Sequence, residues 1–305
     1  MDAHPFDRYR TIVPAWDAFC DALERPLPTC IWTNLLRTTP TRMHHWLETE
    51  GFALAPLPWC AGAFRLPAEV KPGTLLPYRI GHVHVQEEVS MIPPLLLAPL
   101  PGERVLDACA APGNKTAQIA AAMQNRGTVV ANDRSEGRLH ILRRTMARLG
   151  IMNVTTTVAD AARYPDADES YDRVLVDVPC SCEGTSRKHP HMTLDCSAEH
   201  GRRMGGVQKV ILRRAVDLCK PGGRIVYSTC TYAPEENEAV VNAVLNESQG
   251  TLRLLPACID GLVSSAGLEQ WNGAVFDATL RHCVRIWPHQ NDSGGFFVAV
   301  LEKTR

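Results

Sequence analysis

An alternation of strand-like and helix-like segments from about residue 104 onward constrains the fold more than any other feature of this chain. Short apolar runs predict strands at 104–109, 128–132, 154–158, 173–178, 224–228 and 296–301. Apolar residues at helical spacing predict helices at 116–124, 136–149, 204–219 and 235–246. Such alternation is typical of an α/β fold, a doubly wound Rossmann-like sheet that is largely parallel. Residues 258–283 carry no clear pattern, and we expect a loop excursion there.

The residues before this alternation follow other patterns, which divide the chain into three parts. Residues 1–27 have apolar positions at helical spacing and are interpreted as a helical lead. Residues 28–80 combine frequent prolines with short strand candidates, and Thr41 is a candidate cap for a helix there, so we predict a small α+β module. Residues 81–305 then form the α/β domain, opened by a helix at about 86–98.

Composition excludes several classes of protein. The formal net charge of −1 over 305 residues argues against binding to nucleic acid by bulk charge, and we interpret the arginine runs as solvated helix faces. The 11 cysteines are odd in number and follow no basic, apolar leader, so we expect reduced thiols in a cytoplasmic protein. No apolar stretch is long enough to span a bilayer. No Cys-x-x-Cys pair occurs and Cys180-Ser181-Cys182 is too tight for usual ligand spacing, so no metal site is expected.

The first strand-to-helix turn, 107–116, and the acids after the strands point to a particular cofactor. The turn has small residues that let a ligand approach, but it is neither a Gly-x-Gly-x-x-Gly fingerprint nor a Walker loop. Four strands in succession end in an acid: Asp107, Asp133, Asp160 and Asp177. One such aspartate is best explained as a helix cap, but four favour a cationic, ribose-bearing cofactor, which indicates S-adenosylmethionine.

Two cysteines occupy similar places in the pattern. Cys180 and Cys230 lie 50 residues apart, and each follows an apolar run of strand length. Because the carboxyl ends of parallel strands meet at one edge of a sheet, both thiols are expected at the ligand-binding edge beside Asp177. Two thiols next to a carboxylate suggest covalent chemistry on an electrophilic ring. A single cysteine at a strand end would be interpreted as an inert buried thiol, which is how we interpret the remaining cysteines apart from Cys109 and Cys182.

Three longer motifs stand out in the sequence. They are 107–116, Asp-Val-Pro-Cys-Ser-Cys-Glu-Gly-Thr at 177–185, and Tyr-Ser-Thr-Cys-Thr-Tyr-Ala-Pro-Glu-Glu-Asn-Glu at 227–238. Together they resemble the Nop/Sun family (NSUN/RsmF-like) of RNA cytosine-5 methyltransferases. Supporting matches are Gln86-Glu87, Lys-Pro-Gly-Gly at 220–223, Arg-Ile-Trp-Pro-His at 285–289 and Gly-Phe-Phe at 295–297. The resemblance covers about residue 28 to the end. It departs from the family pattern at Asn114 and Cys182, where glycine is usual. The first departure adds a side chain near the cofactor turn, and the second puts a third thiol near the reacting ring.

The resemblance implies an activity and assigns roles to residues. Cys230 is the nucleophile that adds to carbon 6 of cytosine, and Cys180 helps to release the enzyme afterwards. A helix beginning at Glu235 is expected to aid ionisation of Cys230 through its dipole, against the nearby glutamates. Asp177 supports the cytosine, and Lys115 contacts substrate or cofactor. The implied S-adenosylmethionine site comprises Cys109, Ala110, Ala111, Pro112, Gly113, Asn114, Lys115, Asp133 for the ribose, Arg138, Asp160 for the adenine side, and Asp177.

Alternatives to this reading stay open at this point. A DNA cytosine-5 methyltransferase would use Pro-Cys for the attack, and the Thr-Cys motif disfavours it. A non-catalytic RNA-binding or ribosome-assembly protein could keep the same fold. The substrate is expected to be rRNA or tRNA, bound by a monomer. The small module resembles the RNA-recognition-like unit of the family, whose aromatic residues either stack on bases or form its core: Trp32, Trp46, Phe52, Trp59 and Phe64.

Overall fold

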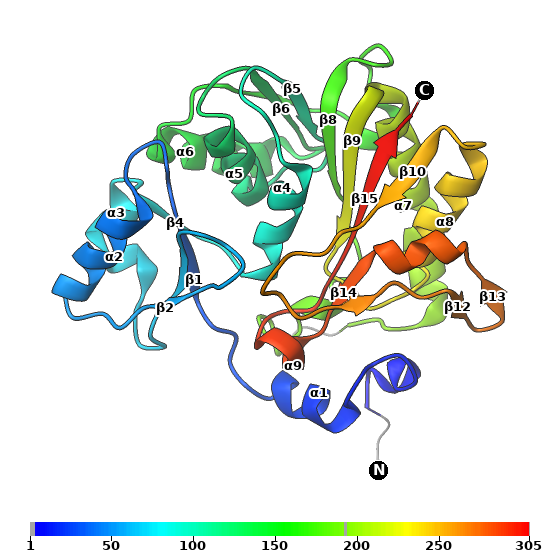
Figure 1. The fold of residues 1–305 in the computed structure, drawn as a ribbon, viewed down its shortest axis with the longest axis horizontal. Helices are drawn as coiled ribbons and strands as arrows, with labels where there is room; N and C mark the ends of the chain where they lie inside the picture. The colour runs from blue at the N-terminus through cyan, green and yellow to red at the C-terminus, as the bar shows by residue number, and fades with distance from the viewer. Residues whose placement is uncertain (1–3, 192–193, 305) are drawn as a thin grey trace.

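A nine-stranded mixed sheet forms the centre of the molecule in this computed structural model, which describes residues 4–191 and 194–304 (Figure 1). Five neighbouring strands are parallel, in the order β9 (Cys219–Thr229), β8 (Tyr171–Asp177), β5 (Arg104–Asp107), β6 (Thr128–Asn132) and β7 (Val154–Thr157). Beyond β9, strand β15 (Phe296–Lys303) is antiparallel and pairs with β14 (Val284–Ile286) and β10 (Leu252–Leu255). The predicted doubly wound sheet is confirmed.

Helices cover both faces of this sheet, because its strands are apolar on both sides. Val105, Val129 and Leu175 pack on one face with α5 (Asn114–Ala122) and α6 (Glu136–Leu149). On the other face, Leu106 and Val174 pack with α7 (Ala198–Leu218) and α8 (Glu238–Glu247). Successive strand residues point to opposite faces, so this two-sided burial explains the continuous apolar runs in the sequence.

Several elements differ from their predicted bounds. Helix α7 begins at Ala198 rather than 204 because Ser197 accepts a hydrogen bond from the His200 amide and caps it. The helix predicted at 86–98 is reduced to a 3-10 turn, Val89–Met91, and α4 (Ile92–Leu97), since two prolines stand at the start of α4. Helix α8 begins at Glu238 rather than at 235.

A separate four-stranded antiparallel sheet lies beside the main sheet, in blue to cyan at the left of Figure 1. Its strand order is β2 (Ala55–Pro56), β3 (Ala63–Arg65), β1 (Cys30–Thr33) and β4 (Val83–Val85), with α2 (Pro40–Thr49), a 3-10 turn at Pro72–Thr74 and α3 (Leu76–Arg79) as its helices. Thr39, not Thr41, caps α2 by accepting from the Arg42 amide. Strand β4 lies past residue 80, where the sequence analysis ended the module.

The aromatic residues of this module belong to its interior. Trp32, Trp59 and Phe64 are each at most 8% exposed. Trp46 and Phe52 are partly buried and pack against the apolar cluster that includes Ile31, Met43 and Leu47. The indole nitrogen of Trp32 donates to Gln86 at 2.9 Å. Of the two alternatives that the sequence left open, the structure favours a core role for the three buried rings, because packing between the sheet and its neighbours takes up their surface.

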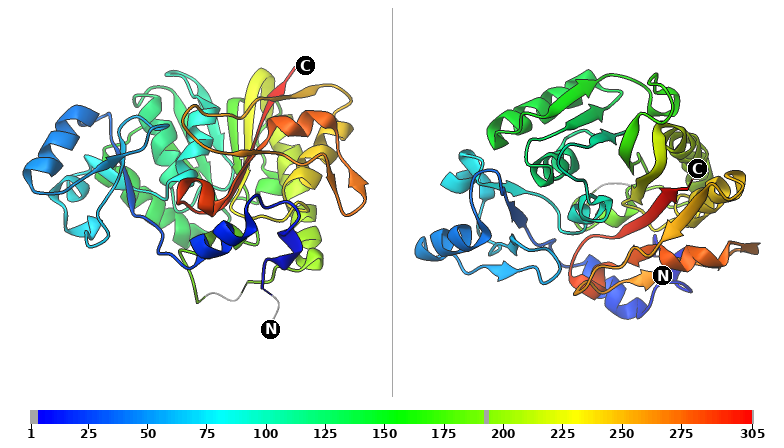
Figure 2. Two further views of the ribbon diagram at one scale, coloured as in Figure 1. Left: turned by 60° about the horizontal axis from the view of Figure 1, so that its bottom comes forward. Right: turned by 45° about the horizontal axis from the view of Figure 1, so that its top comes forward.

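The N-terminal lead and the segment before β15 pack together away from the module, as both views in Figure 2 show. The lead contains a 3-10 turn (Asp7–Tyr9) and α1 (Trp16–Leu23), which contacts α9 (Pro288–Asn291). Phe6, Tyr9 and Phe19 bury their rings against Tyr232 and Trp287. The lead is thus attached to the segment that directly follows Cys230.

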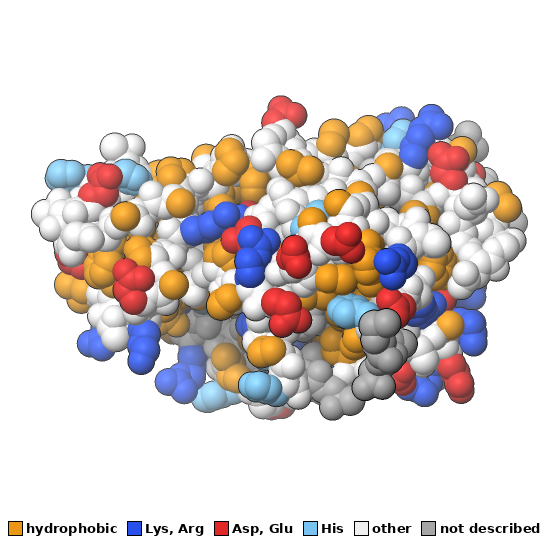
Figure 3. Space-filling view, turned by 90° about the horizontal axis from the view of Figure 1, so that it is seen from below, with side chains coloured by type: hydrophobic (Ala, Val, Ile, Leu, Met, Phe, Trp, Pro, Cys, Tyr) orange, Lys and Arg blue, Asp and Glu red, His pale blue; other side chains and the backbone are white. Residues whose placement is uncertain are grey.

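Residues 258–283, predicted as a loop excursion, contain short regular elements. β11 (Ser265–Ala266) pairs with β14 at the edge of the main sheet, and β12 (Gln270–Trp271) pairs with β13 (Ala274–Val275) as a hairpin before a 3-10 turn (Ala278–His282). Among the described residues, no helix has the length and apolar character that crossing a membrane requires. The face seen from below mixes both signs of charge (Figure 3), in keeping with the near-zero net charge.

Candidate active site

The turn between β5 and α5 forms one end of a cavity at the carboxyl edge of the parallel strands. Asp107 is only 1% exposed, and Thr116 donates to its Oδ2 at 2.6 Å. Its Oδ1 has no hydrogen-bond partner among the described residues, and burial raises the pKa of Asp107 to about 7. Gly113 has φ +106°, and a Cβ there would lie 2.7 Å from the Leu142 side chain. The turn therefore requires glycine at this position.

Asp133, at the end of β6, holds this turn in place. Its carboxylate accepts from the amides of Ala111 at 3.2 Å and Ser135 at 2.9 Å. Arg138 on α6 lies 3.3 Å from the same carboxylate and donates to the Ala111 carbonyl. Asp133 is 4% exposed. A carboxylate has further lone pairs, so it can accept from a ligand hydroxyl while it keeps these contacts.

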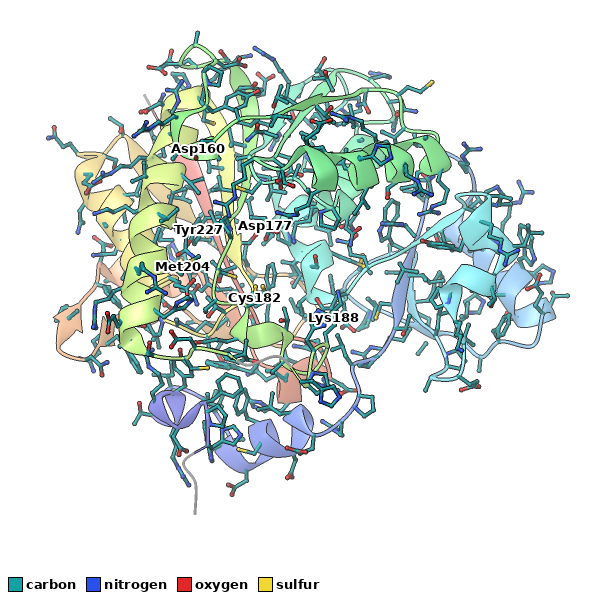
Figure 4. The ribbon with its side chains drawn as sticks, turned by 180° about the vertical axis from the view of Figure 1, so that it is seen from behind. Asp160, Asp177, Cys182, Lys188, Met204 and Tyr227 are labelled. Carbon is teal, nitrogen blue, oxygen red and sulfur yellow. The ribbon has the colours of Figure 1, made fainter. Side chains whose placement is uncertain are left out.

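Asp160 caps a short turn and also lies at the cavity. It accepts from the Ala162 amide at 3.0 Å and so caps the short turn Ala161–Arg163. It is also exposed and contributes to the wall of the same cavity. In Figure 4, Asp160, Asp177 and Cys182 follow one another down the middle of the molecule.

Three cysteine sulfurs meet at the other end of the cavity. The Sγ atoms of Cys180 and Cys230 lie 3.4 Å apart, although 50 residues separate them in the chain. Cys182 joins them, and all three sulfurs lie within 4.8 Å of one another. Cys182 has φ +60° and its Sγ lies 3.3 Å from the Cys180 carbonyl oxygen. The two predicted cysteines are thus brought together, and Cys182 is the third thiol that the departure from the family pattern placed near them.

Mutual contact shifts the acidity of these thiols in opposite directions. Hydrogen bonds from Cys180 and Cys230 lower the pKa of Cys182. Contact with the other two thiols, together with burial, raises the pKa of Cys180. The pKa of Cys230 is also raised, because Cys182 and burial outweigh a hydrogen bond from Cys180. One negative charge is therefore favoured in the cluster, and a second is opposed by the first.

Lys115 and Asp177 form an ion pair between the two ends of the cavity. The Nζ of Lys115 lies 2.7 Å from Asp177 Oδ2, and Ser228 donates to the other carboxylate oxygen at 2.7 Å. Burial alone would lower the pKa of Lys115, but Asp177 outweighs it and the pKa is raised. Lys115 is thus a stable cation next to the thiols, and Asp177 has a fixed orientation.

The loops that carry the thiols are tied to each other by residues that the sequence analysis gave no role. Glu183 is buried and accepts from Tyr9 Oη at 2.8 Å, Thr231 Oγ1 at 3.0 Å and the Tyr232 amide at 3.1 Å. The Gly184 amide donates to the Cys230 carbonyl at 2.8 Å. These contacts fix the Cys180 loop against the Cys230 loop and the N-terminal lead.

Gly184 and Gly295 cross at close range beneath these loops. The Gly295 amide donates to the Gly184 carbonyl at 2.9 Å. A Cβ on Gly184 would lie 2.2 Å from the Gly295 oxygen, and one on Gly295 would lie 2.1 Å from the Tyr232 ring. No side chain fits at either position.

The cavity between the two ends has a volume of about 520 Å³. Almost all the predicted site residues line it: Cys109, Ala110, Ala111, Pro112, Asn114, Lys115, Asp133, Arg138, Asp160, Asp177, Cys180 and Cys230. Gly113 is not in the wall but shapes the turn behind it. Glu87 also lines the cavity; it accepts from the Gly294 amide at 3.0 Å, and burial raises its pKa. The sequence signalled Glu87 only as part of the Gln86-Glu87 match.

The predicted helix start at Glu235 is wrong, because α8 begins at Glu238. The residues between form a turn, in which Asn237 bonds to Thr229 and to the Thr231 carbonyl. Asn114, which departs from the family pattern, has a contact of its own. Its Oδ1 lies 3.1 Å from His84 Nε2 on β4, so it joins the cofactor turn to the module.

The fold and this cavity define a class of protein, the S-adenosylmethionine-dependent methyltransferases of Rossmann-like fold. The family model described as "16S rRNA methyltransferase RsmB/F" matches residues 94–302. The chain therefore belongs to the RsmB/F family of methyltransferases, in agreement with the Nop/Sun resemblance of its motifs.

Individual relatives support this membership. A tRNA (cytosine(49)-C(5))-methyltransferase from Pyrococcus abyssi is 36% identical over 291 residues, which cover 95% of this chain and 92% of that protein. Ribosomal RNA small subunit methyltransferase F from Serratia proteamaculans is 35% identical over 304 residues, 96% of this chain but only 61% of that protein. The crystal structure of a methyltransferase homolog protein from Pyrococcus horikoshii aligns with a TM-score of 0.86 at 30% identity, over 97% of this chain and 93% of that one.

The residues of the cavity fit S-adenosylmethionine, the methyl donor of this family. The volume falls in the ordinary range of ligand sites, roughly 300–1,000 Å³. The unpartnered Oδ1 of buried Asp107 and the carboxylate of Asp133 offer acceptors to ligand hydroxyl or ammonium groups. Asp133 and Asp160 add negative charge at this end of the cavity, which favours a cationic ligand.

Proposed function

We propose that this protein methylates carbon 5 of a cytosine in ribosomal or transfer RNA through a covalent adduct with Cys230. The observation that carries the proposal is the 3.4 Å pair of Cys180 and Cys230 sulfurs, which opens on the same cavity as the four acids. Relatives named for cytosine-C5 methylation of tRNA and of 28S rRNA, each at least 35% identical over more than nine tenths of this chain, support the reaction and the substrate class.

The cofactor end of the cavity binds and orients the methyl donor in this proposal. Asp133 accepts from the ribose hydroxyls, Asp160 faces the adenine side, and the small residues of the turn at 108–113 allow close approach. Arg138 holds Asp133 and the Ala111 carbonyl, and so acts on the turn rather than on the reaction. Bound S-adenosylmethionine supplies an electrophilic methyl group on a sulfonium centre.

Cys230 then makes the cytosine reactive. Its thiolate adds to carbon 6, so a carbon–sulfur bond forms and the π electrons shift towards carbon 5 and ring nitrogen 3. Asp177 accepts from the 4-amino group of the base. A proton supplied to nitrogen 3 from the Lys115–Asp177 pair neutralises the charge that develops there. Carbon 5 is now nucleophilic and takes the methyl group.

Cys180 completes the reaction by removing a proton. After methylation, carbon 5 carries both a hydrogen and the methyl group. Cys180, as a thiolate in contact with Cys230, takes that proton. The double bond between carbons 5 and 6 re-forms, the bond from carbon 6 to Cys230 breaks, and ring nitrogen 3 returns its proton to the Lys115–Asp177 pair. The Cys230 thiolate is restored, and methylated RNA is free to leave.

Trapping the adduct tests the covalent route. Cys180→Ser is expected to stop at the adduct, because a serine hydroxyl removes the carbon 5 proton poorly. The measurement is a denaturing gel of protein incubated with RNA and S-adenosylmethionine, where a shifted band is expected. The double variant Cys180→Ser/Cys230→Ser is the matched control and should give no band. A single variant that releases RNA normally contradicts the role of Cys180.

The RNA itself is identified by bisulfite sequencing of total RNA from cells with and without the gene. We expect at least one protected cytosine in rRNA or tRNA to be lost without the gene. Unchanged cytosine protection in both RNA classes would contradict the substrate assignment.

We further propose that the chain acts as a monomer. In this proposal the module, extended to Val85 by strand β4, contributes to RNA binding through its surface rather than through its buried rings.

A further inference from the structure

The three thiols at the reacting end of the cavity have an arrangement that covalent catalysis by two cysteines does not require. The Cys182 sulfur lies with those of Cys180 and Cys230 in one group, each within 4.8 Å of the others. Cys180 and Cys182 come from one loop, whereas Cys230 comes from the end of β9. All three are partly accessible and line the cavity, so a small ion can reach them.

The distances between the three sulfurs are close to those around a metal ion that three thiolates coordinate. Zinc binds thiolate at about 2.3 Å, so three sulfurs around one ion lie about 3.8–4.0 Å from one another. The observed group, with one pair at 3.4 Å and no pair beyond 4.8 Å, reaches that geometry through shifts of less than an ångström or so. The cavity leaves a fourth position open to water.

Neighbouring contacts fix the positions of the three thiols. The backbone of Cys182 is fixed in the left-handed region, and Glu183 and Gly184 tie its loop to the Cys230 loop. Lys115 is close enough to Cys230 for their charges to interact, and so offsets part of the negative charge of three thiolates. A site whose ligands are already placed loses little entropy on binding.

We propose that Cys180, Cys182 and Cys230 bind one soft metal ion, such as Zn²⁺, Cu⁺ or Cd²⁺, and that this ion blocks methyl transfer by occupying the nucleophile. Three metal–sulfur bonds form, the thiol protons pass to solvent, and no electron is transferred. The sequence analysis expected no metal because it considered only neighbours along the chain. Binding does not depend on the proposed function, whereas the inhibitory effect does.

Cadmium titration tests the site directly. Cd²⁺ added to the reduced full-length protein is expected to give a cadmium–thiolate ultraviolet absorption band that saturates at one ion per chain. Cys182→Gly removes one of three ligands at a position whose φ glycine adopts freely, so the fold should survive and the affinity should fall at least about tenfold. Cys182→Ser, which keeps the size of the side chain, should behave alike.

The control is Cys258→Ser, which removes an exposed cysteine elsewhere and should leave the band unchanged. Absence of the band in the unaltered protein, or equal Cd²⁺ affinity in Cys182→Gly, overturns the proposal. A band that Cys258→Ser abolishes does so too, because the ion then binds elsewhere.

Inhibition is measured as the ratio of methyl transfer with and without buffered Zn²⁺ in each variant. The unaltered protein should lose activity at Zn²⁺ concentrations that Cys182→Gly tolerates, and a chelator should restore it. A ratio that is equal in the two proteins contradicts the inhibitory role. Absence of methyl transfer in metal-free buffer would count against the proposed function, while the cadmium band still decides the metal site.

Discussion

The two ends of the cavity are built in different ways. At the cofactor end, Asp107, Asp133 and Gly113 lie on adjacent strand ends and turns, and most of their contacts connect β5, β6 and the turns that follow them. At the thiol end, Cys180 and Cys230 depend on contacts between segments far apart in the chain. Glu183, for example, bonds both to Thr231 of the Cys230 loop and to Tyr9 of the lead.

This difference assigns different tasks to the two ends. The cofactor end is an edge of the sheet lined by acids that accept hydrogen bonds. The thiol end brings together sulfur atoms from two loops, and in the proposed function these sulfurs react with the base. Binding of the methyl donor and reaction with the base should therefore respond separately to substitution, and the three predictions below test that separation in order of expected effect.

Cys230→Ser should have the largest effect and should act on the thiol end alone. Serine lacks an accessible anion, so we expect methyl transfer to fall by at least about 10³-fold. S-adenosylmethionine affinity, measured by calorimetry, should stay within a few fold, since the acids are untouched. Appreciable methyl transfer by this variant would remove the assigned nucleophile, and a large loss of affinity would show that the ends are not separate.

Lowering the pH should destabilise the protein through His84, which joins the cofactor turn to the small module. Arg148 donates to Nδ1 of His84, whose Nε2 bonds to Asn114; burial lowers the pKa of His84 to about 4. The unfolded chain, with a histidine pKa of about 6.5, binds more protons between these values, so stability is lost as pH falls through this range.

From pH 7 to pH 5 this one group should cost about 2 kcal/mol of unfolding free energy. The measurement is urea unfolding at both pH values, in the unaltered protein and in His84→Gln, which does not titrate. All other titrating groups are the same in the two proteins. His84→Gln should therefore lose about 2 kcal/mol less unfolding free energy than the unaltered protein between pH 7 and pH 5. Equal losses of unfolding free energy in the two proteins would mean that the pKa of His84 is not lowered by folding.

Asp133→Asn should have the smallest effect of the three, confined to the cofactor end. Asparagine can still accept from the Ala111 amide but loses the negative charge and one acceptor. We expect S-adenosylmethionine to bind about tenfold more weakly, by roughly 1.4 kcal/mol, because a hydrogen bond to a charged group is lost. Calorimetry checks this. Unchanged affinity would exclude the ribose contact.

The same contrast explains how much the sequence could predict. Strand β6 and helix α6 have the bounds predicted, because alternating apolar residues, the Ser135 cap and Gly150 are all local signals. The acids of the cofactor end were found for the same reason. The Cys180–Cys230 pairing followed from the rule that parallel strand ends meet at one edge.

What the sequence did not reveal depends on tertiary contacts. Nothing local indicates that Glu183 accepts from Tyr9 or that Asn114 contacts His84. The rings of Trp32 and Trp59 could be exposed or buried by pattern alone, and only packing against Gln86 and Glu88 decides it. Helix α8 starts late because Asn237 bonds to its neighbours instead of continuing the helix.

The crossing of Gly184 and Gly295 has a consequence for mutational tolerance. Neither residue has a side chain that could react, yet a single added methyl at either place would force apart the loops that bear the sulfur atoms. In a saturation library scored for methylation, these two positions should be as intolerant as the cysteines themselves. When the same library is scored for protein abundance, the glycine variants should be depleted because they misfold. Cysteine-to-serine variants should stay as abundant as the unaltered protein.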